Sequence, residues 1–194
     1  KLQKQVDFLE KNQEYVLTSH LRIIVDEKGN PVTNSDSLTK DYSTQCIVFR
    51  NVLRNDFLTF DSTGITNGDT FLFTYLESFG KMTILDFVGS AYRKTGTGIW
   101  ASYDYRKKFE LATRSFSRME YFFKKYDYKI SLQKTKIYYL NSVYNFALSL
   151  KSDKRKTEAY KYYFKFLQGI AENLNNRFIY NLGYLKMLLA FPFK

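Results

Sequence analysis

Residues 67–94 read NGDTFLFTYLESFGKMTILDFVGSAYRK, and this stretch decides which kind of fold the chain can adopt. Its first part is typical of a helix that opens at Asp69, because apolar side chains recur at helical spacing before the glycine that closes it. The runs 82–87 and 88–94 follow, and their β-branched and aromatic residues predict two strands around Gly89. A helix followed by strands predicts an α/β arrangement.

The residues before this stretch favour the same class. Their patterns predict a helix over 1–12, strands over 14–25 and 45–49, a turn over 26–31, and polar loops over 33–41 and 61–68. We therefore expect a mixed sheet with flanking helices in the first half of the chain.

The residues after this stretch read as helices only. Apolar side chains at helical spacing predict helices near 104–127, 131–150, 154–170 and 176–190, separated by short joints. Paired helices of this length with short joints favour stacked helical hairpins.

Composition shifts near Trp100. Residues 1–100 contain 11 Lys and Arg against 12 Asp and Glu, whereas residues 101–194 contain 19 against 7. The second half also holds 23 of the 35 Tyr and Phe residues. We therefore expect two regions, 1–103 and 104–194, of which the second is basic, aromatic-rich and helical.

The composition excludes several classes of protein. The 194 residues contain no apolar run long enough to cross a membrane, and residues 1–20 lack the apolar core of a signal peptide. Cys46 and His20 are the only cysteine and histidine, so neither an internal disulfide nor a zinc site of Cys and His ligands can form. The chain begins at Lys1 rather than Met, which suggests that the natural N-terminus lies further upstream.

Asp69 is the most pointed candidate for chemistry. A carboxylate at a helix N-terminus is held in a fixed direction by backbone N–H groups and by the helix dipole. This placement suits a general base that takes a proton from an incoming hydroxyl, and it equally suits a plain helix cap.

Arg93 and Lys94 are the second candidate, because the Gly-Thr-rich run 95–98 follows them directly. Such a loop lets backbone N–H groups approach a phosphate, and Arg adds a bidentate fork. The alternative is a solvated strand end with a loose linker. His20 lies in the middle of a predicted strand, where a half-buried structural histidine is the expected role.

The order of these motifs resembles the C-terminal half of the catalytic domain of family 2 glycosyltransferases, which have the GT-A fold. The resemblance covers residues 1–103 and rests on the segments 1–10, 15–26, 44–51, 68–73, 80–86, 91–94 and 98–100. It implies a partial GT-A-like mixed sheet whose nucleotide-binding half and metal-binding Asp motif lie ahead of Lys1. No Asp-x-Asp occurs in the chain itself.

The resemblance also implies a function. Intact, the enzyme would move a sugar from a nucleotide-sugar donor to the hydroxyl of a sugar or lipid-linked acceptor with inversion, in the assembly of bacterial surface polysaccharide. A divalent metal, Mg or Mn, would be held mostly by ligands outside this chain, and the chain alone would be inactive. By this resemblance Asp69 is the general base, whereas the donor and acceptor contacts are Gly68, Thr70, Arg93, Lys94 and Trp100. Thr95 stands where the family often has His, and Thr70 where many members have Trp.

The resemblance leaves the helical region 104–194 unassigned. Residues 180–194 mix aromatic, aliphatic and Lys side chains as interfacial helices do, so we expect a cytoplasmic enzyme that could dock on the anionic inner face of the membrane. Ordinary core packing of this segment is the interpretation that we favour over docking. Two other classes of protein stay open, a helical nucleic-acid-binding module and a protein-interaction module. The dense Tyr and Lys pattern of 121–166 would suit nucleic acid, but we regard that as the weaker assignment.

Overall fold

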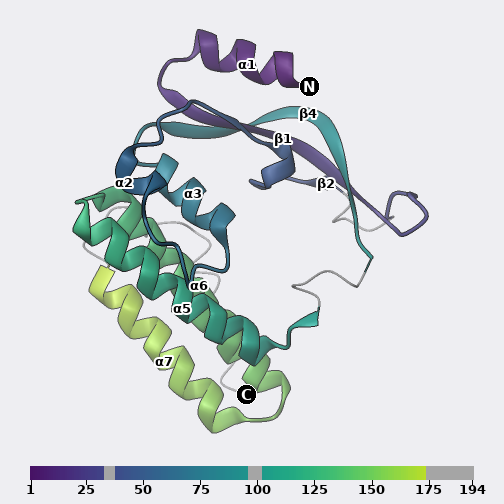
Figure 1. The fold of residues 1–194 in the computed structure, drawn as a ribbon. Coiled ribbons are helices and arrows are strands. Elements are labelled where there is room, and N and C mark those ends of the chain that lie inside the picture. The colour runs from purple at the N-terminus through teal and green to yellow at the C-terminus, as the bar shows by residue number, and fades with distance from the viewer. Residues whose placement is uncertain (33–37, 96–101, 174–194) are drawn as a thin grey trace.

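A computed structural model describes residues 1–32, 38–95 and 102–173 of the chain, with side chains up to residue 170. A small sheet lies between helix α1 (Leu2–Lys11) on one side and helices α3, α5 and α6 on the other (Figure 1). The mixed α/β class and the helical C-terminal part are as predicted.

Strand β1 (Tyr15–Val25) is the centre of the sheet. It pairs antiparallel with β2 (Leu38–Thr39) and with β3 (Val48–Phe49), and it pairs in parallel with β4 (Lys81–Arg93) along its whole length. Among the described strands only β1 pairs with β4, so the outer edge of β4 is open.

The prediction of two strands around Gly89 is wrong, because β4 is continuous. Its register against β1 shifts between His20 and Leu21 and again between Leu21 and Arg22. A Cβ atom at Gly89 would lie 2.7 Å from the Cε1 atom of His20. Gly89 therefore lets β4 pass over the His20 ring rather than ending the strand.

The strand predicted over 45–49 is only partly correct. Residues Thr44–Cys46 form a 3₁₀ turn, and the strand begins at Val48. The carbonyl of Cys46 accepts a hydrogen bond from Gln5 Nε2 at 2.8 Å, and its buried thiol lies 3.3 Å from Ser90 Oγ. These side-chain partners hold the turn in place of ladder bonds.

Helix α3 (Gly68–Leu76) follows a long loop that contains the short helix α2 (Asn55–Leu58). It begins one residue earlier than predicted, with Asn67 as its N-cap residue. Its buried side chains join a hydrophobic cluster with residues of β1, of α5 and of the turn after α5: Val16, Leu17, Phe71, Phe73, Tyr75, Leu76, Met119, Phe122, Phe123 and Tyr128.

Three of the four helices predicted for the second half are confirmed. They are α5 (Tyr105–Lys125), α6 (Lys129–Ser152) and α7 (Lys156–Asn173). The turns between them contain Asp127 and Lys154, which have positive φ angles of 56° and 60°. The fourth predicted helix, 176–190, lies outside the described residues, and so does the segment 180–194, whose docking on membranes stays a prediction.

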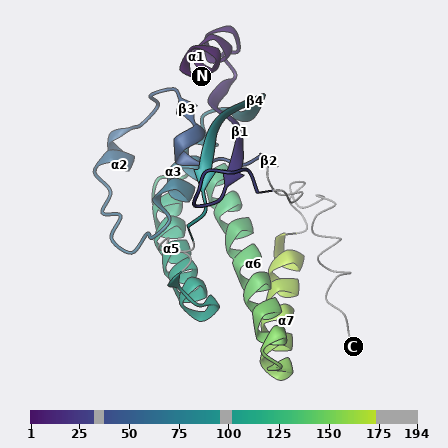
Figure 2. The same cartoon turned by 90° about the vertical axis from the view of Figure 1, so that its right-hand side faces the viewer.

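Figure 2 shows α5, α6 and α7 as a layer of helices beneath the sheet. A second cluster fills the space between α6 and α7, around Val143, Ala147 and Phe166. The first cluster contains side chains from both sides of the predicted boundary at 103/104, so the two regions share part of their core. The division into two domains stays a prediction.

Candidate functional site

Asp69 lies in the first turn of α3 and its side chain is exposed. Its Oδ1 atom accepts a hydrogen bond from the backbone N–H of Thr70 at 2.7 Å. Within the described part of the chain, Oδ2 makes no hydrogen bond. Asn67, not Asp69, occupies the N-cap position, so the alternative that Asp69 is the helix cap is wrong. The carboxylate is anchored by one oxygen and offers the other to solvent.

The two neighbours of Asp69 differ in their surroundings. Gly68 is exposed, and a Cβ atom built on it would meet nothing within 4 Å. The glycine is therefore not forced on this position by a close approach within the protein. Thr70 is half-buried and lines a small cavity between α3, α5 and α6.

Arg93 and Lys94 lie at the C-terminal end of β4, and both are exposed. The backbone N–H of Lys94 donates to Val25 O at 2.9 Å, which continues the parallel pairing past the end of the strand. Figure 1 shows this strand end at the right-hand side of the view, apart from α3. The described residues thus do not bring Arg93 or Lys94 to Asp69, and Trp100 lies outside them. Their role as donor or acceptor contacts stays a prediction.

A groove runs beside the start of α3. It is a cavity of about 490 Å³ between α5 and α6, with Asn67 from the loop at one side. Its lining residues are Asn67, Tyr105, Lys108, Phe109, Ala112, Ser142, Asn145, Phe146 and Ser149. We call this cavity the α5–α6 groove. A smaller cavity of about 40 Å³ adjoins it, because Asn67, Ala112 and Ser142 line both.

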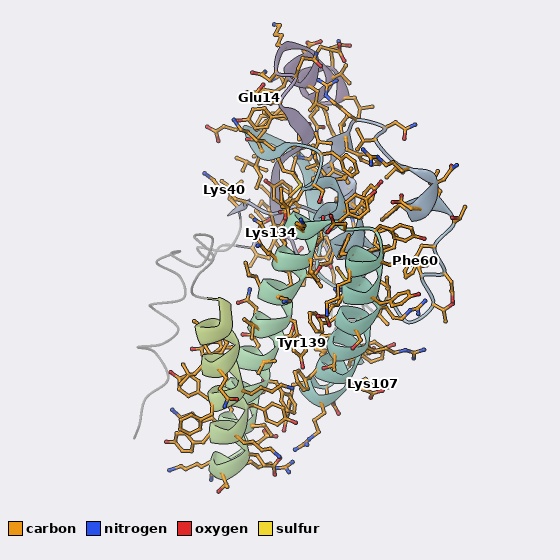
Figure 3. The ribbon with its side chains drawn as sticks, turned by 90° about the vertical axis from the view of Figure 1, so that its left-hand side faces the viewer. Glu14, Lys40, Phe60, Lys107, Lys134 and Tyr139 are labelled. Carbon is orange, nitrogen blue, oxygen red and sulfur yellow. The ribbon has the colours of Figure 1, made fainter. Side chains whose placement is uncertain are left out.

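The loop before α3 is tied to this groove. Ser115 on α5 accepts a hydrogen bond from the backbone N–H of Thr66 at 2.9 Å, and its hydroxyl lies 2.9 Å from Thr66 Oγ1. Figure 3 shows α5 and α6 side by side, with Tyr139 where the two helices face each other. The contacts of Ser115 therefore fix the N-terminal end of α3, and with it Asp69, against the two helices.

The sequence reasoning missed the groove residues Asn67, Ser142 and Asn145. It assigned no role in the site to the helical region, although Ser142, Asn145 and Ser149 recur at helical spacing on α6. The signal that could have found Ser142 and Asn145 is the helical spacing of small polar side chains among the apolar residues of a core-facing helix.

A second cluster of charged residues lies at the other end of α3. Glu77 and Lys134 approach to 3.7 Å between Oε2 and Nζ, and they line a cavity of about 730 Å³ with Tyr42, Lys81 and Tyr138 among its other residues. Burial raises the pKa of Glu77, and the ammonium group of Lys134 opposes that rise. Burial, and the nearby charge of Glu77, raise the pKa of Tyr42. Figure 3 labels Lys134, which lies above Tyr139 in that view.

His20 is fully buried, not half-buried as predicted. Its Nδ1 atom lies 2.9 Å from Leu21 O, its ring packs on Phe87 at 5.4 Å between centroids, and Gly89 faces it from β4. This packing makes His20 part of the sheet core.

The described residues contain no group of three or more His, Cys, Asp or Glu side chains that could hold a metal ion. The resemblance places the metal ligands mostly outside this chain, and that expectation stays a prediction. Within the same residues, no helix is both long and apolar enough to cross a membrane.

Comparison with known proteins identified no matching family model, no matching curated protein and no matching solved structure. The resemblance to family 2 glycosyltransferases therefore rests on the sequence motifs alone.

Proposed function

We propose that this chain is the acceptor-side part of an inverting glycosyltransferase, which transfers a sugar from a nucleotide-sugar donor to an acceptor hydroxyl in the assembly of a surface polysaccharide. One observation carries the proposal. Asp69, which the motif order marks as the general base, lies exposed in the first turn of α3 with one carboxylate oxygen anchored and the other open to solvent.

The proposed reaction is a single displacement at the anomeric carbon. Asp69 Oδ2 takes the proton of the acceptor hydroxyl while that oxygen attacks the anomeric carbon. The bond from this carbon to the nucleoside diphosphate breaks on the opposite face, so the anomeric configuration inverts. General-base catalysis of this kind contributes typically about 10²–10⁴-fold to the rate.

The chain's own residues orient the base. The N–H of Thr70 fixes Asp69 Oδ1, and Ser115 fixes the loop that leads into α3. The N-terminal end of a helix dipole favours a negative charge at this place. The carboxylate is therefore positioned before the acceptor arrives.

The stereochemical outcome tests this function. The product of the full-length gene is incubated with nucleotide-sugar donors and sugar acceptors, and the anomeric configuration of the new bond is read by NMR. We expect the configuration opposite to that of the donor. Retention would exclude single displacement, and hydrolysis or transfer that does not require a nucleotide sugar would exclude the enzyme class.

A further inference from the structure

We propose that the α5–α6 groove binds the acceptor, and that the acceptor is a neutral oligosaccharide rather than an anionic or lipid chain. This inference rests on the proposed function, because it names the substrate class that Asp69 would deprotonate. It gives the helical region 104–173 a role in the site.

The groove reaches the residues on either side of the candidate base, although Asp69 itself lines neither cavity. Asn67 lines both cavities and precedes Asp69 by two residues, whereas Thr70 lines the smaller cavity and follows it directly. A ligand that fills the groove therefore ends at the first turn of α3. The volume of about 490 Å³ lies within the range of small-molecule binding sites.

The lining chemistry matches hydroxyl groups. Amides and hydroxyls, from Asn67, Asn145 and Ser142 among others, both donate and accept hydrogen bonds, as sugar hydroxyls do. Ser142 Oγ donates to Tyr138 O at 3.2 Å, which leaves its oxygen as an acceptor for a ligand O–H. Phe109 is half-buried and supplies apolar surface for a sugar ring, whereas Phe146 is buried and stacks on Phe109.

The charge of the lining argues against the two other ligand classes. Among the residues that the structure describes, no carboxylate lines the groove, and Lys108 is the one cation in its lining, at an exposed position. An anionic chain would be met by clustered Arg or Lys forks, which the lining lacks. A lipid tail would leave the amides and hydroxyls of the lining without partners, at a cost in binding free energy.

The small cavity adds a specific contact. Asn67 Oδ1 is buried and has no hydrogen-bond partner among the described residues. The adjoining 40 Å³ exceeds the space that one water needs, and its lining also includes Thr70, Ser115 and Tyr138. A hydroxyl or hydroxymethyl group of the sugar nearest Asp69 would fill this space and satisfy Asn67.

The walls of the groove are held by stacked rings. Phe109 and Phe146 stack at 4.2 Å between centroids with an interplanar angle of 9°, and Phe116 stacks on Tyr139 at 4.3 Å. Each pair joins α5 to α6. A groove whose walls are already ordered loses less free energy on binding.

Binding of defined tetrasaccharides tests the proposal. The ¹⁵N-labelled chain is titrated with neutral probes (maltotetraose, cellotetraose and tetra-N-acetylchitotetraose), with the anionic probe tetragalacturonate, and with dodecyl phosphate as the lipid probe. We expect at least one neutral probe to bind and to shift amide signals in 67–70 and 142–149. Binding by none of the neutral probes, preferred binding of either other probe, or shifts confined to other regions would overturn the proposal.

Two variants locate the site. Ser142→Leu places an apolar side chain in the groove, and we expect it to weaken binding about tenfold or more. Ser117→Leu is the matched control, because Ser117 is exposed on α5 and donates to the carbonyl four residues earlier, as Ser142 does. Asn145→Ala removes one exposed amide with little risk to folding and should also weaken binding. Equal affinities of all these chains would refute the groove.

The outcome is separable from that of the proposed function. In the full-length enzyme, Ser142→Leu should raise the acceptor KM. Sugar binding without any glycosyl transfer would refute the function alone, whereas transfer with an unchanged KM in Ser142→Leu would refute the groove alone.

Discussion

Replacing Gly89 by alanine tests how β4 crosses the core. The new Cβ atom would lie 2.7 Å from both Cε1 and Nδ1 of His20 and 2.8 Å from Cδ2. These contacts are far inside van der Waals distance. The His20 ring cannot easily move away, because it is fully buried, packs on Phe87 and has its Nδ1 atom 2.9 Å from Leu21 O.

The magnitude follows from this overpacking. Forcing an extra methyl group into a filled core costs typically about 1–3 kcal/mol. For a chain of this size, each kcal/mol lowers the Tm by roughly 2–4 °C. Thermal unfolding of Gly89→Ala followed by circular dichroism should therefore show a Tm lower by a few degrees to about 10 °C.

Two further variants make the argument refutable. Gly68→Ala, where a Cβ meets nothing within 4 Å, should be neutral or should stabilise the helix by about 0.5–1 kcal/mol. In a His20→Ala background, Gly89→Ala should cost less, with a coupling of about 0.5–3 kcal/mol between the two sites. A Tm of Gly89→Ala equal to that of the wild-type chain, or no coupling with His20, would refute the proposed close crossing.

Four other predictions concern the charge of Glu77, membrane docking, self-association and activity. Burial raises the pKa of Glu77 in the folded chain, so folding favours its protonated form and the free energy of unfolding should fall as pH rises from about the ordinary value of 4.5 through the raised pKa. Urea unfolding across that pH range should show this fall. Glu77→Gln should flatten the pH dependence and be more stable than the wild type at neutral pH. If the basic helical region docks on membranes, the chain should partition onto anionic vesicles more than onto neutral ones at low salt, and equal partitioning would exclude docking. A steep linear dependence of DNA or RNA affinity on salt would instead favour the nucleic-acid-binding class. Val88 and Tyr92 on β4 are 51% and 45% exposed, and no other described strand than β1 pairs with β4, so the 194-residue chain alone should self-associate in sedimentation experiments; a monomer at high concentration would contradict this. By its resemblance to half of a catalytic domain, the chain alone should also show no turnover of a nucleotide sugar, and turnover would contradict that expectation.

The elements that the sequence predicted well are those defined by local periodicity. Helices α1 and α5–α7 carry apolar residues at helical spacing, which marks them without knowledge of the rest of the chain. Strand β1 is marked by a run rich in β-branched and apolar residues, which is buried without a break from Val16 to Leu21. The elements that it missed depend on partners distant in sequence. Gly89 resembles a strand break until His20 is placed opposite it, and the turn at Thr44–Cys46 is held by Gln5 on α1.

The same distinction applies to the candidate site. The position of Asp69 near an exposed helix start follows from the residues around it, and the sequence placed that start within one residue of where the structure has it. The groove beside it depends on which faces of α5 and α6 meet and on the contact of Ser115 with Thr66, 49 residues away in the chain. Helical periodicity identifies the buried face of each helix, but it does not identify the partner that the face meets.

The central claim is that Asp69 accepts the proton of the acceptor hydroxyl. The most direct measurement is the single-turnover rate of Asp69→Asn in the full-length enzyme, compared with Asp86→Asn, which removes an exposed carboxylate from β4. Asparagine keeps the size of the side chain and an oxygen that can accept from Thr70, but it cannot take up the proton. We predict a rate lower by about 10²-fold or more for Asp69→Asn, with a Tm close to that of the wild type and a near-normal rate for Asp86→Asn. A near-normal single-turnover rate in Asp69→Asn would contradict the account.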